Sequence, residues 1–397
     1  MANQLKETLE SNIRKYQTIA NELNYFIANN PELSGEEYQA YEKYVTILKK
    51  YNISVEEKFC GIPTAFRGSI LKTETPYLKI AILVEYDALP DIGHGCGHSA
   101  SGAISFLAGM ALKDSLEGKG VAIDLIGTPD EERQGCKVKM SEEGIFKSYD
   151  LAMMVHLNSN ETVPSPKFIA LGAYKVRFYG KSSHAAAAPW DGVNALTAAQ
   201  IAFHAIDAQR QQFKPETRVA YYIDEGGKAS NIITDFVECQ VEFRHSNANY
   251  LSTLKKKIED CIKGASIATG TTYELETVGY EYKDLLENGT GVQLLKTTLD
   301  ELEEKYIESN VESGSSDVGN ISYDCPTLHP LLATSDYYFS LHTKDMTEVV
   351  KSDKANKIIK RGARVIGYTI LNLLEDEKHI EDVKNEFRKV IERNSRK

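Results

Sequence analysis

Three short apolar runs that alternate with helical segments constrain the fold of this 397-residue chain more than any other feature. They are "YLKIAILV" (77–84), "VAIDLIG" (121–127) and "LAMMV" (151–155), and such continuous runs are typical of strands buried on both faces. An apolar helix is expected over 100–112 and a polar helix around 137–147. The alternation of strand and helix predicts an α/β domain with a parallel sheet covered by helices.

A second region, from about 170 to 282, has a different order of elements. It begins with a long strand pattern, "IALGAYKVRFYGKS", and continues with a helix over 191–213. Two alternating strands that could pair antiparallel follow, "TRVAYYIDEGG" and "DFVECQVEFRHSN", and then a helix over 250–268 and a strand in "TTYELETVGYEY". This β-α-β-β-α-β order predicts a separate small α+β domain, inserted in the larger one.

The insertion divides the larger domain into two parts. Apolar residues have helical spacing over 3–28 and 36–50, before the first strand. Helices over 291–309 and 353–375 are expected to complete the same domain after the insertion. The predicted boundaries are residues 1–169 and 283–397 for the two parts of the larger domain and 170–282 for the insert.

The composition is that of a globular protein and narrows the choice of partners. The chain is 42% apolar and 26% charged, which is ordinary for a globular fold. Its formal net charge of -11 argues against nucleic acid or an anionic membrane as the main ligand. We expect no transmembrane span, because no run of about 18 apolar residues occurs. The N-terminal "MANQLKETLESNIRKYQ" lacks a signal-peptide apolar core, and six scattered cysteines indicate reduced thiols in a cytoplasmic protein.

Candidate metal ligands follow each of the three predicted strands, in the order of the chain. They are Asp87, Cys96 and His98 after the first strand, Asp130, Glu131 and Glu132 after the second, and His156 after the third. Alone, a cysteine or histidine in such a loop is most often structural, and adjacent glutamates are most often solvent-exposed. Because ligands bind beyond the carboxyl ends of parallel strands, the three loops are expected to converge. That convergence favours a metal site.

The types of ligand indicate which ions and which reaction to expect. Thiolate, imidazole and carboxylate together suit zinc, with manganese or cobalt as alternatives. Gly93, Gly95 and Gly97 would let the backbone bend so that Cys96 and His98 face one ion. A thiolate can bridge two ions, and two ions about 3.5–4 Å apart lower the pKa of a water molecule and polarise a carbonyl. With one glutamate as ligand and its neighbour as general base, the predicted chemistry is amide hydrolysis.

At these residues the sequence resembles the M20 family of two-domain metallopeptidases and amidohydrolases, which includes aminoacylases, dipeptidases, carboxypeptidases and the p-aminobenzoyl-glutamate and auxin-conjugate hydrolases. The matching segments run in order along nearly the whole chain: "YDALP", "GCGHSASG", "GTPDEE", "VH", "GKSSHAAAAPWDGVNAL", "GGKASNIITD", "SSDVGN" and "LHT". The "GCGH" form, with cysteine where other branches have a bridging aspartate, is similar to the amidohydrolase branch. "SSDVGNISYDCPTLHP" is closest to p-aminobenzoyl-glutamate hydrolases and HmrA-type peptidases. The resemblance implies a zinc-peptidase-like catalytic domain with an inserted ferredoxin-like lid and dimerisation domain.

The resemblance also implies roles for individual residues of the larger domain. The implied metal ligands are Cys96, His98, Glu132, His156 and His342. Glu131 would be the general base, and Asp87 would fix the orientation of a ligand imidazole. Many relatives have a histidine ligand two residues before that aspartate, where this chain has Glu85. The implied ligand set therefore takes its imidazole from His98 instead. For the last ligand the motif position favours His342, and His329 is the alternative.

Three residues of the insert have implied roles as well. His184, in "GKSSHAAAAPW", would cross a dimer interface and donate a hydrogen bond to the oxyanion in the partner's site; a structural histidine at a strand end is the alternative. Asn231 and Arg244 match positions that hold the substrate's backbone or carboxylate, and the planar guanidinium suits the carboxylate. A surface salt bridge is the alternative for Arg244. His94 is expected to cap its loop, and His204 to belong to the core or the surface.

Together these features predict a hydrolase with two divalent metal ions. Its substrate would be a dipeptide, a short peptide or an N-acyl amino acid such as p-aminobenzoyl-glutamate, cleaved at an amide bond beside a free carboxylate. A homodimer or homotetramer is expected, since His184 would act from a second subunit. The alternative is a catalytically inactive metal- or peptide-binding protein on the same fold, which would need a broken base or ligand set, whereas Glu131 and the implied ligands are all in place.

Overall fold

The computed structural model describes residues 2–309, 311–312 and 314–395. These residues form two compact units, each with its own core. The first unit takes the described residues within Met1–Lys167, Leu285–Ser313 and Asp317–Lys397. The second consists of Phe168–Asp284 and Gly314–Ser316.

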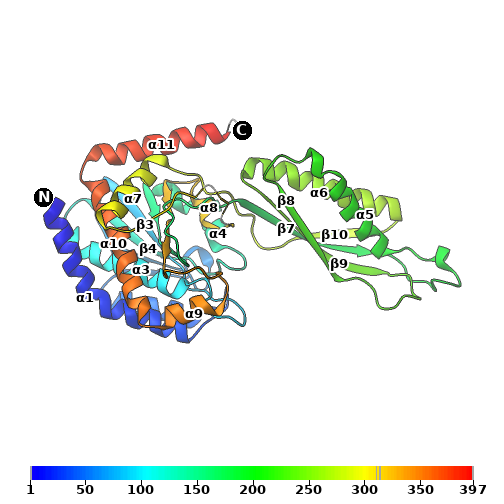
Figure 1. Cartoon of the computed structure of the whole chain (residues 1–397), viewed down its shortest axis with the longest axis horizontal. Helices are drawn as coiled ribbons and strands as arrows, with labels where there is room; N and C mark the ends of the chain where they lie inside the picture. Colours follow the sequence, from blue (N-terminus) through cyan, green and yellow to red (C-terminus); the bar gives the residue numbers. More distant parts are fainter. Residues whose placement is uncertain (1, 310, 313, 396–397) are drawn as a thin grey trace. The chain divides into compact units, whose positions relative to one another are not determined.

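The first unit is built around a six-stranded sheet with the order β1-β2-β4-β3-β5-β11 (Figure 1). Its strands are β1 (Ser54–Glu57), β2 (Phe66–Leu71), β3 (Leu78–Val84), β4 (Val121–Gly127), β5 (Leu151–Met153) and β11 (Thr327–Leu328). The four strands β4, β3, β5 and β11 are parallel, whereas β1 and β2 are antiparallel to their neighbours. A small parallel pair, β6 (His156–Asn158) with β12 (Leu331–Ala333), continues beyond β5 and β11.

The helix α3 (His98–Ser115) explains why the middle of this unit is so apolar. It packs against β3 and β4 and also against α1 (Ala2–Asn29) and α10 (Lys354–Leu374). Because it is covered by the sheet and by two helices, nearly all of its side chains are buried and it has no polar face. The other helices of the unit are α2 (Tyr38–Lys50), α4 (Cys136–Glu142), α7 (Gly289–Glu301), α8 (Val318–Ile321), α9 (Lys344–Lys351) and α11 (Glu377–Ser395), with short 3-10 turns at Phe59–Gly61 and Ile145–Ser148.

The second unit is an antiparallel sheet with two helices on one face (Figure 1). Its strand order is β10-β7-β9-β8, which is the order of a ferredoxin-like β-α-β-β-α-β unit. The elements are β7 (Ala170–Tyr179), α5 (Ala195–Ala208), β8 (Arg218–Glu225), β9 (Phe236–His245), α6 (Ala248–Thr269) and β10 (Thr272–Thr277), with 3-10 turns at Pro189–Asp191 and Arg210–Gln212. Alternate residues of β9 are buried, because only one face of the sheet packs against helices.

The predicted fold class is confirmed: a parallel-sheet α/β unit carries an inserted α+β unit. Several predicted helices are shorter than expected. The one around 137–147 stops at Glu142, because Gly144 adopts a left-handed φ of +74°. The helix predicted from 191 begins only at Ala195, where the Asn194 side chain caps the first turn. None of the described helices has the length and apolar content needed to cross a membrane.

Candidate metal centre and catalytic site

The candidate site lies where the direction of the strand connections changes. From β3 the chain continues to β4 on one side, and β5 lies on the other side of β3. A switch of this kind opens a crevice beyond the carboxyl ends of the strands. The loops that carry the candidate ligands leave from those ends, after Val84, Gly127 and Met153.

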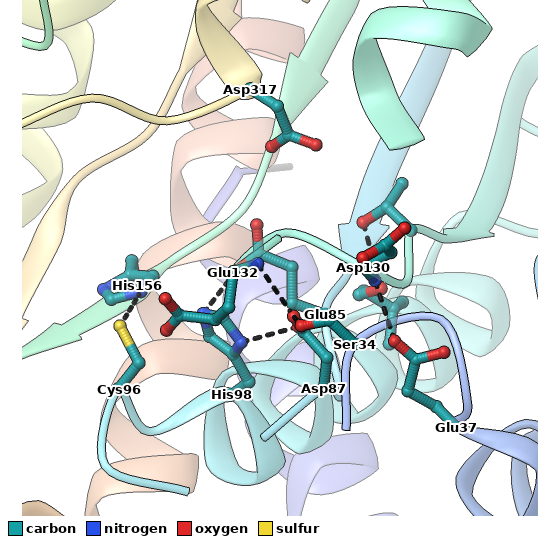
Figure 2. A network of polar contacts seen from close by, with 12 residues as sticks. Ser34, Glu37, Glu85, Asp87, Cys96, His98, Asp130, Glu132, His156 and Asp317 are labelled. Carbon is teal, nitrogen blue, oxygen red and sulfur yellow. Dashed lines mark hydrogen bonds and ion pairs between the residues drawn. The ribbon is translucent and has the colours of Figure 1, made fainter. Parts of the chain in front are cut away.

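Cys96 is the centre of the candidate metal site (Figure 2). Its Sγ lies 3.5 Å from His156 Nε2 and 3.4 Å from His342 Nε2. Two groups of potential ligand atoms, each within 4.8 Å of one another, share this cysteine: one adds His98 and His156, and the other adds Glu132 and His342. Two ligands of one tetrahedral zinc ion are about 3.4–3.6 Å apart, given bonds of about 2.0–2.3 Å. The spacing around Cys96 therefore suits ligands of shared ions.

The glycine-rich loop before α3 brings Cys96 and His98 to the same side. Gly97 has a φ of +88°, and a Cβ atom there would lie 2.9 Å from the Leu157 side chain. A side chain at this position would be both strained and crowded. Since Gly97 is the N-cap of α3, its left-handed turn lets His98 begin the helix while Cys96 stays in the loop.

Asp87 and His98 form a buried pair. The Nδ1 atom of His98 lies 2.8 Å from Asp87 Oδ1, and neither side chain is exposed. Although burial alone would raise it, the charge and hydrogen bond of His98 hold the pKa of Asp87 well below its usual range. An ionised Asp87 requires the proton of the imidazole on Nδ1, which leaves Nε2 as the atom that can bind a metal.

Asp87 also connects the loops of the site. Its Oδ2 atom accepts hydrogen bonds from Ser34 Oγ at 2.8 Å and from the Glu132 backbone N–H at 2.9 Å. The carboxylate therefore orients His98 and fixes the start of the loop that carries the two glutamates.

Glu131 and Glu132 are adjacent in sequence but differ in surroundings. The Oε1 atom of Glu132 lies 3.7 Å from His342 Nε2. Glu131 is only partly exposed; burial and the nearby carboxylates of Glu85 and Glu132 raise its pKa well above its usual value, and Lys137 opposes that shift. A carboxyl group whose pKa is raised in this way is suited to accept and return a proton.

The two candidates for the last ligand differ in position. The N–H of His342 donates to the Gly95 carbonyl at 3.0 Å, which ties its loop to the Cys96 loop, and its side chain is 54% exposed. His329 is almost fully buried and its ring stacks on His156, with ring centroids 5.7 Å apart. Burial and the neighbouring His156 lower the pKa of His329 to about 3. The geometry favours His342.

His94 and His204 lie away from the cluster around Cys96. The His94 side chain is buried, and its carbonyl accepts the Gly97 N–H at 3.1 Å within the glycine-rich loop. His204 is exposed on α5. Neither belongs to a group of potential metal ligands among the described residues.

Two candidates in the second unit, His184 and Asn231, are exposed. The Nδ1 atom of His184 accepts hydrogen bonds from the backbone N–H groups of Ala186 and Ala187, at 3.2 and 3.1 Å. Because a nitrogen that accepts carries no proton, the neutral ring has its proton on Nε2 and can donate from there. His184 and Asn231 lie on adjoining segments. The backbone N–H of Ala185, which follows His184, donates to the Asn231 carbonyl at 2.9 Å.

Arg244 lies on β9 and is partly exposed. Its Nε donates to Glu242 at 2.7 Å, and its Nη1 donates to Ser315 Oγ at 3.3 Å. The ion pair with Glu242 is the contact expected if Arg244 only forms a salt bridge at the surface. The bond to Ser315 shows that the guanidinium also contacts a second segment of the same unit, beyond β9.

Sequence reasoning missed a buried ionic cluster beside the site. The Nζ atom of Lys137 lies 2.7 Å from Glu85 Oε1 and 2.6 Å from Asp317 Oδ1, and all three side chains are 0% exposed. Lysine is almost never buried unless it is paired. The available signal was weak, because Lys137 falls in a predicted polar helix and Asp317 lies within "SSDVGN" without an assigned role.

Sequence reasoning also missed the support that Glu37 gives to the glutamate loop. Its Oε1 atom accepts from the backbone N–H groups of Gly35 at 2.6 Å and Asp130 at 2.9 Å, and Oε2 accepts from Thr64 Oγ1 at 3.0 Å. Asp130 has a left-handed φ of +61° directly before Glu131. Glu37 and Asp130 lie together at one end of the network in Figure 2.

The donors at the site fit a pair of divalent cations. They combine a thiolate, imidazoles and a carboxylate, which is the chemistry of zinc sites. Among the described residues, the buried atoms His98 Nε2 and Glu132 Oε1 have no hydrogen-bond partner. Burying polar atoms without partners is unfavourable, and a pair of cations at this site would give each of the two atoms a partner.

Comparison with known proteins found similar chains along most of the length. Residues 170–269 match the sequence family M20_dimer, described as "Peptidase dimerisation domain". An "Xaa-Arg dipeptidase" of Mus musculus is 34% identical over 374 residues, 90% of this chain and 86% of that protein. One of the p-aminobenzoyl-glutamate hydrolase subunits of Escherichia coli is 27% identical over 290 residues, 68% of this chain and 59% of that protein.

A solved structure shares the fold over almost the whole chain. It is a Bacillus subtilis protein described as a dinuclear metal binding peptidase from the M20 family. The two structures superpose with a TM-score of 0.67 at 16% identity, covering 90% of this chain and 99% of that chain.

Proposed function

This chain belongs to the M20 family of metallopeptidases and is a metal-dependent amide hydrolase, and from that premise we propose that it cleaves dipeptides beside their free C-terminal carboxylate. The similarity to an Xaa-Arg dipeptidase makes dipeptides that end in arginine the first candidates. The similarity to a p-aminobenzoyl-glutamate hydrolase makes N-acyl amino acids of that kind the second. Both relatives favour an enzyme over the inactive binding protein considered as the alternative.

The observation that carries the proposal is the convergence of distant side chains around Cys96. We propose that two divalent cations are held there, zinc first, with manganese or cobalt as alternatives. The proposed ligands are Cys96, His98, Glu132, His156 and His342. Such ions, when bound, supply a water molecule of lowered pKa and polarise the substrate carbonyl.

The side chains of the first unit would move and hold the protons. Glu131 would take a proton from the attacking water and return it to the nitrogen of the leaving amine. Its partly buried position among carboxylates, which raises its pKa, supports this role because the protonated form is then stabilised between the two transfers. Asp87 would keep the His98 proton on Nδ1 throughout.

The side chains of the second unit would bind the substrate and the charge that develops on it. We propose that His184 of one subunit donates from Nε2 to the oxyanion in the site of a second subunit. The hydrogen bonds that fix Nδ1 as an acceptor and the match to a dimerisation domain support this. Asn231 and Arg244 would hold the backbone and the free carboxylate of the substrate.

A substrate panel tests the proposed function. The purified chain is loaded with Zn²⁺, Mn²⁺ or Co²⁺ and assayed with Xaa-Arg, Xaa-Glu and Xaa-Ala dipeptides, their C-terminal amides, and p-aminobenzoyl-glutamate. We expect hydrolysis of at least one free-acid dipeptide, loss of activity with a chelator, recovery on adding metal back, and little turnover of the matched amide. Hydrolysis that persists in the chelator, or equal rates for acid and amide, would contradict the proposal.

A further inference from the structure

Trp190 is an exposed side chain of the second unit, and nothing in the proposed mechanism uses it. It is the only tryptophan of the chain, although tryptophan is highly buried on average. Its exposed fraction, 78%, is the largest among the large apolar residues that the structure describes. A single exposed apolar side chain is ordinary by itself, but this one belongs to the turn that carries His184.

That turn holds Trp190 at a fixed place relative to His184. Trp190 lies in the 3-10 turn Pro189–Asp191, whose first residue has its φ restricted by the proline ring. The N–H of Ala188, directly before this turn, donates to the His184 carbonyl at 3.0 Å. The N–H of Gly192, directly after it, donates to the Pro189 carbonyl at 3.2 Å. The imidazole and the indole are therefore carried by one short, hydrogen-bonded segment.

Asp191 adds a negative charge beside the indole. It follows Trp190 directly and is also exposed. The face of a tryptophan ring attracts a cation more strongly than the faces of tyrosine and phenylalanine do, and the cation is more often arginine than lysine. A carboxylate can accept two hydrogen bonds from one guanidinium. An exposed indole and an exposed carboxylate on adjacent residues therefore suit a guanidinium and disfavour an anion.

We propose that Trp190 and Asp191 of one subunit bind a cationic side chain, arginine before lysine, of the dipeptide held in the site of a second subunit. The inference rests on the proposed function, in which His184 reaches that site, and it adds two residues that select the substrate. The similarity to an Xaa-Arg dipeptidase agrees with this choice of side chain.

The chemistry of a dipeptide places the selected side chain near the turn. His184 would donate to the oxygen of the scissile carbonyl, and only two bonds separate the carbon of that carbonyl from the Cα of the C-terminal residue. A turn that reaches this oxygen therefore also lies near the start of the C-terminal side chain. Since Trp190 belongs to the same turn, a long C-terminal arginine can extend to its ring.

The preference between two dipeptides tests the proposal. Trp190→Leu keeps an apolar side chain but removes the aromatic face, and Asp191→Asn removes the charge. Both full-length variants and the wild type are loaded with metal and assayed with Ala-Arg and Ala-Ala. We expect the ratio of kcat/KM for Ala-Arg to that for Ala-Ala to fall by about 3–30-fold with Trp190→Leu and by about 2–5-fold with Asp191→Asn, mainly through KM.

Two further variants serve as controls. Trp190→Phe keeps a weaker aromatic face and should retain part of the preference for Ala-Arg. Ile267→Ala shortens another exposed apolar side chain of the same unit, on α6, and should leave the preference unchanged.

The fluorescence of Trp190 reports binding directly, because no other tryptophan is present. The full-length Glu131→Gln variant, which should bind dipeptides but cleave them very slowly, is titrated with Ala-Arg and with Ala-Ala under selective excitation of tryptophan. We expect a saturable change in emission with Ala-Arg and little change with Ala-Ala. This measurement keeps Trp190 in place, so it does not depend on the folding of Trp190→Leu.

The possible outcomes are distinct. Equal losses of kcat/KM for both dipeptides in Trp190→Leu would assign the indole to the fold or to the contact between subunits and would overturn the proposal. Equal changes in emission with both dipeptides would overturn it too. A wild type that cleaves both dipeptides without preferring Ala-Arg would contradict this inference alone, whereas a wild type that cleaves no dipeptide would contradict the proposed function itself.

Discussion

The candidate residues of the two units are held in opposite ways. In the first unit three candidate ligands, Cys96, His156 and His342, come from separate segments of the chain. The Nε2 atoms of the two histidines nevertheless lie within 3.5 Å of the Cys96 sulfur. In the second unit His184 is exposed, and its ring is fixed by the amides of Ala186 and Ala187, two and three residues further along. The first arrangement depends on the whole fold of its unit, and the second depends on a local turn. Substitution of a metal ligand in the first unit should therefore change the metal content, the free energy of unfolding and kcat together. Substitution of His184 should change kcat alone.

The largest effect is expected from Glu131→Gln, which separates catalysis from metal binding within the first unit. The amide cannot accept the proton of the attacking water, so kcat should fall by about 10³–10⁴-fold. Because Glu131 is not one of the proposed ligands, the metal content should stay at the wild-type value. Steady-state kinetics and elemental analysis of the same sample measure both.

Glu132→Gln is the matched control for that experiment. Glu132 is a proposed ligand, so this variant should lose metal as well as activity. If Glu131→Gln retains a kcat within about tenfold of the wild type, a loss far below that of a missing general base, Glu131 is not the base.

The second prediction concerns the stability of the buried cluster. Lys137→Met leaves Glu85 and Asp317 buried without their cation, and breaking a buried ion pair in this way is strongly destabilising. We expect the free energy of unfolding, measured with urea, to fall by about 3–5 kcal/mol. Lys256→Met is the control from the other unit, since Lys256 pairs with Asp260 on the surface, and its urea midpoint should not change measurably. Similar midpoints for both variants would remove the distinction drawn between the units.

The third prediction tests the second unit. His184→Ala should lower kcat by about 10²–10³-fold, as the loss of an oxyanion donor does, with unchanged metal content and unfolding temperature because the side chain is exposed. His204→Ala, another exposed histidine of the same unit, should behave as the wild type.

A mixing experiment tests whether His184 acts in a second subunit. Subunits with Glu131→Gln are combined with subunits carrying His184→Ala, both nearly inactive alone. A mixed dimer has one site with both residues intact, so activity should return on mixing. If no activity returns although mixed dimers form, His184 acts within its own chain or has no catalytic role.

The smallest effect is expected at Glu37, which supports the glutamate loop. Burial and, after it, the charge of Asp87 raise the pKa of Glu37 from 4.5 to about 7. Between these values the folded protein binds more protons than the unfolded chain, so stability decreases as the pH rises through this window. Glu37→Gln removes this titration, and its amide oxygen can accept the same two backbone N–H groups. Between about pH 5 and pH 8 the variant should lose about 1–3 kcal/mol less stability than the wild type.

Glu36→Gln is the control for the pH experiment, since Glu36 is exposed. Its stability should follow the wild-type curve across the same range. Parallel curves for the wild type and Glu37→Gln would show that Glu37 does not titrate in this window.

The parts that the sequence could predict follow from its periodic patterns. The runs at 77–84 and 121–127 predict parallel strands, and this pairing puts the residues after them at one edge of the sheet. That is why Cys96, His98 and the two glutamates could be grouped from the sequence alone. The order of elements in the insert likewise predicts its sheet.

The parts that it could not predict depend on contacts with no pattern along the chain. Lys137 resembles a surface lysine in sequence, and only the fold places it between two buried carboxylates. His342 and His329 are both plausible ligands by chemistry, and what distinguishes them is that His342 Nε2 lies 3.4 Å from the Cys96 sulfur, a contact between segments far apart in the sequence. The strands β1, at the edge of the sheet, and β2 beside it were also missed, because short, partly exposed strands have little apolar signal.

Anomalous X-ray diffraction from crystals grown with Zn²⁺ would locate the metal ions themselves. We expect two zinc peaks, each within about 2.3 Å of the Cys96 sulfur: one also bonded to His98 and His156, and the other to Glu132 and His342. A single zinc ion, or two ions that do not share Cys96, would contradict the claim that this thiolate joins a pair of metal ions.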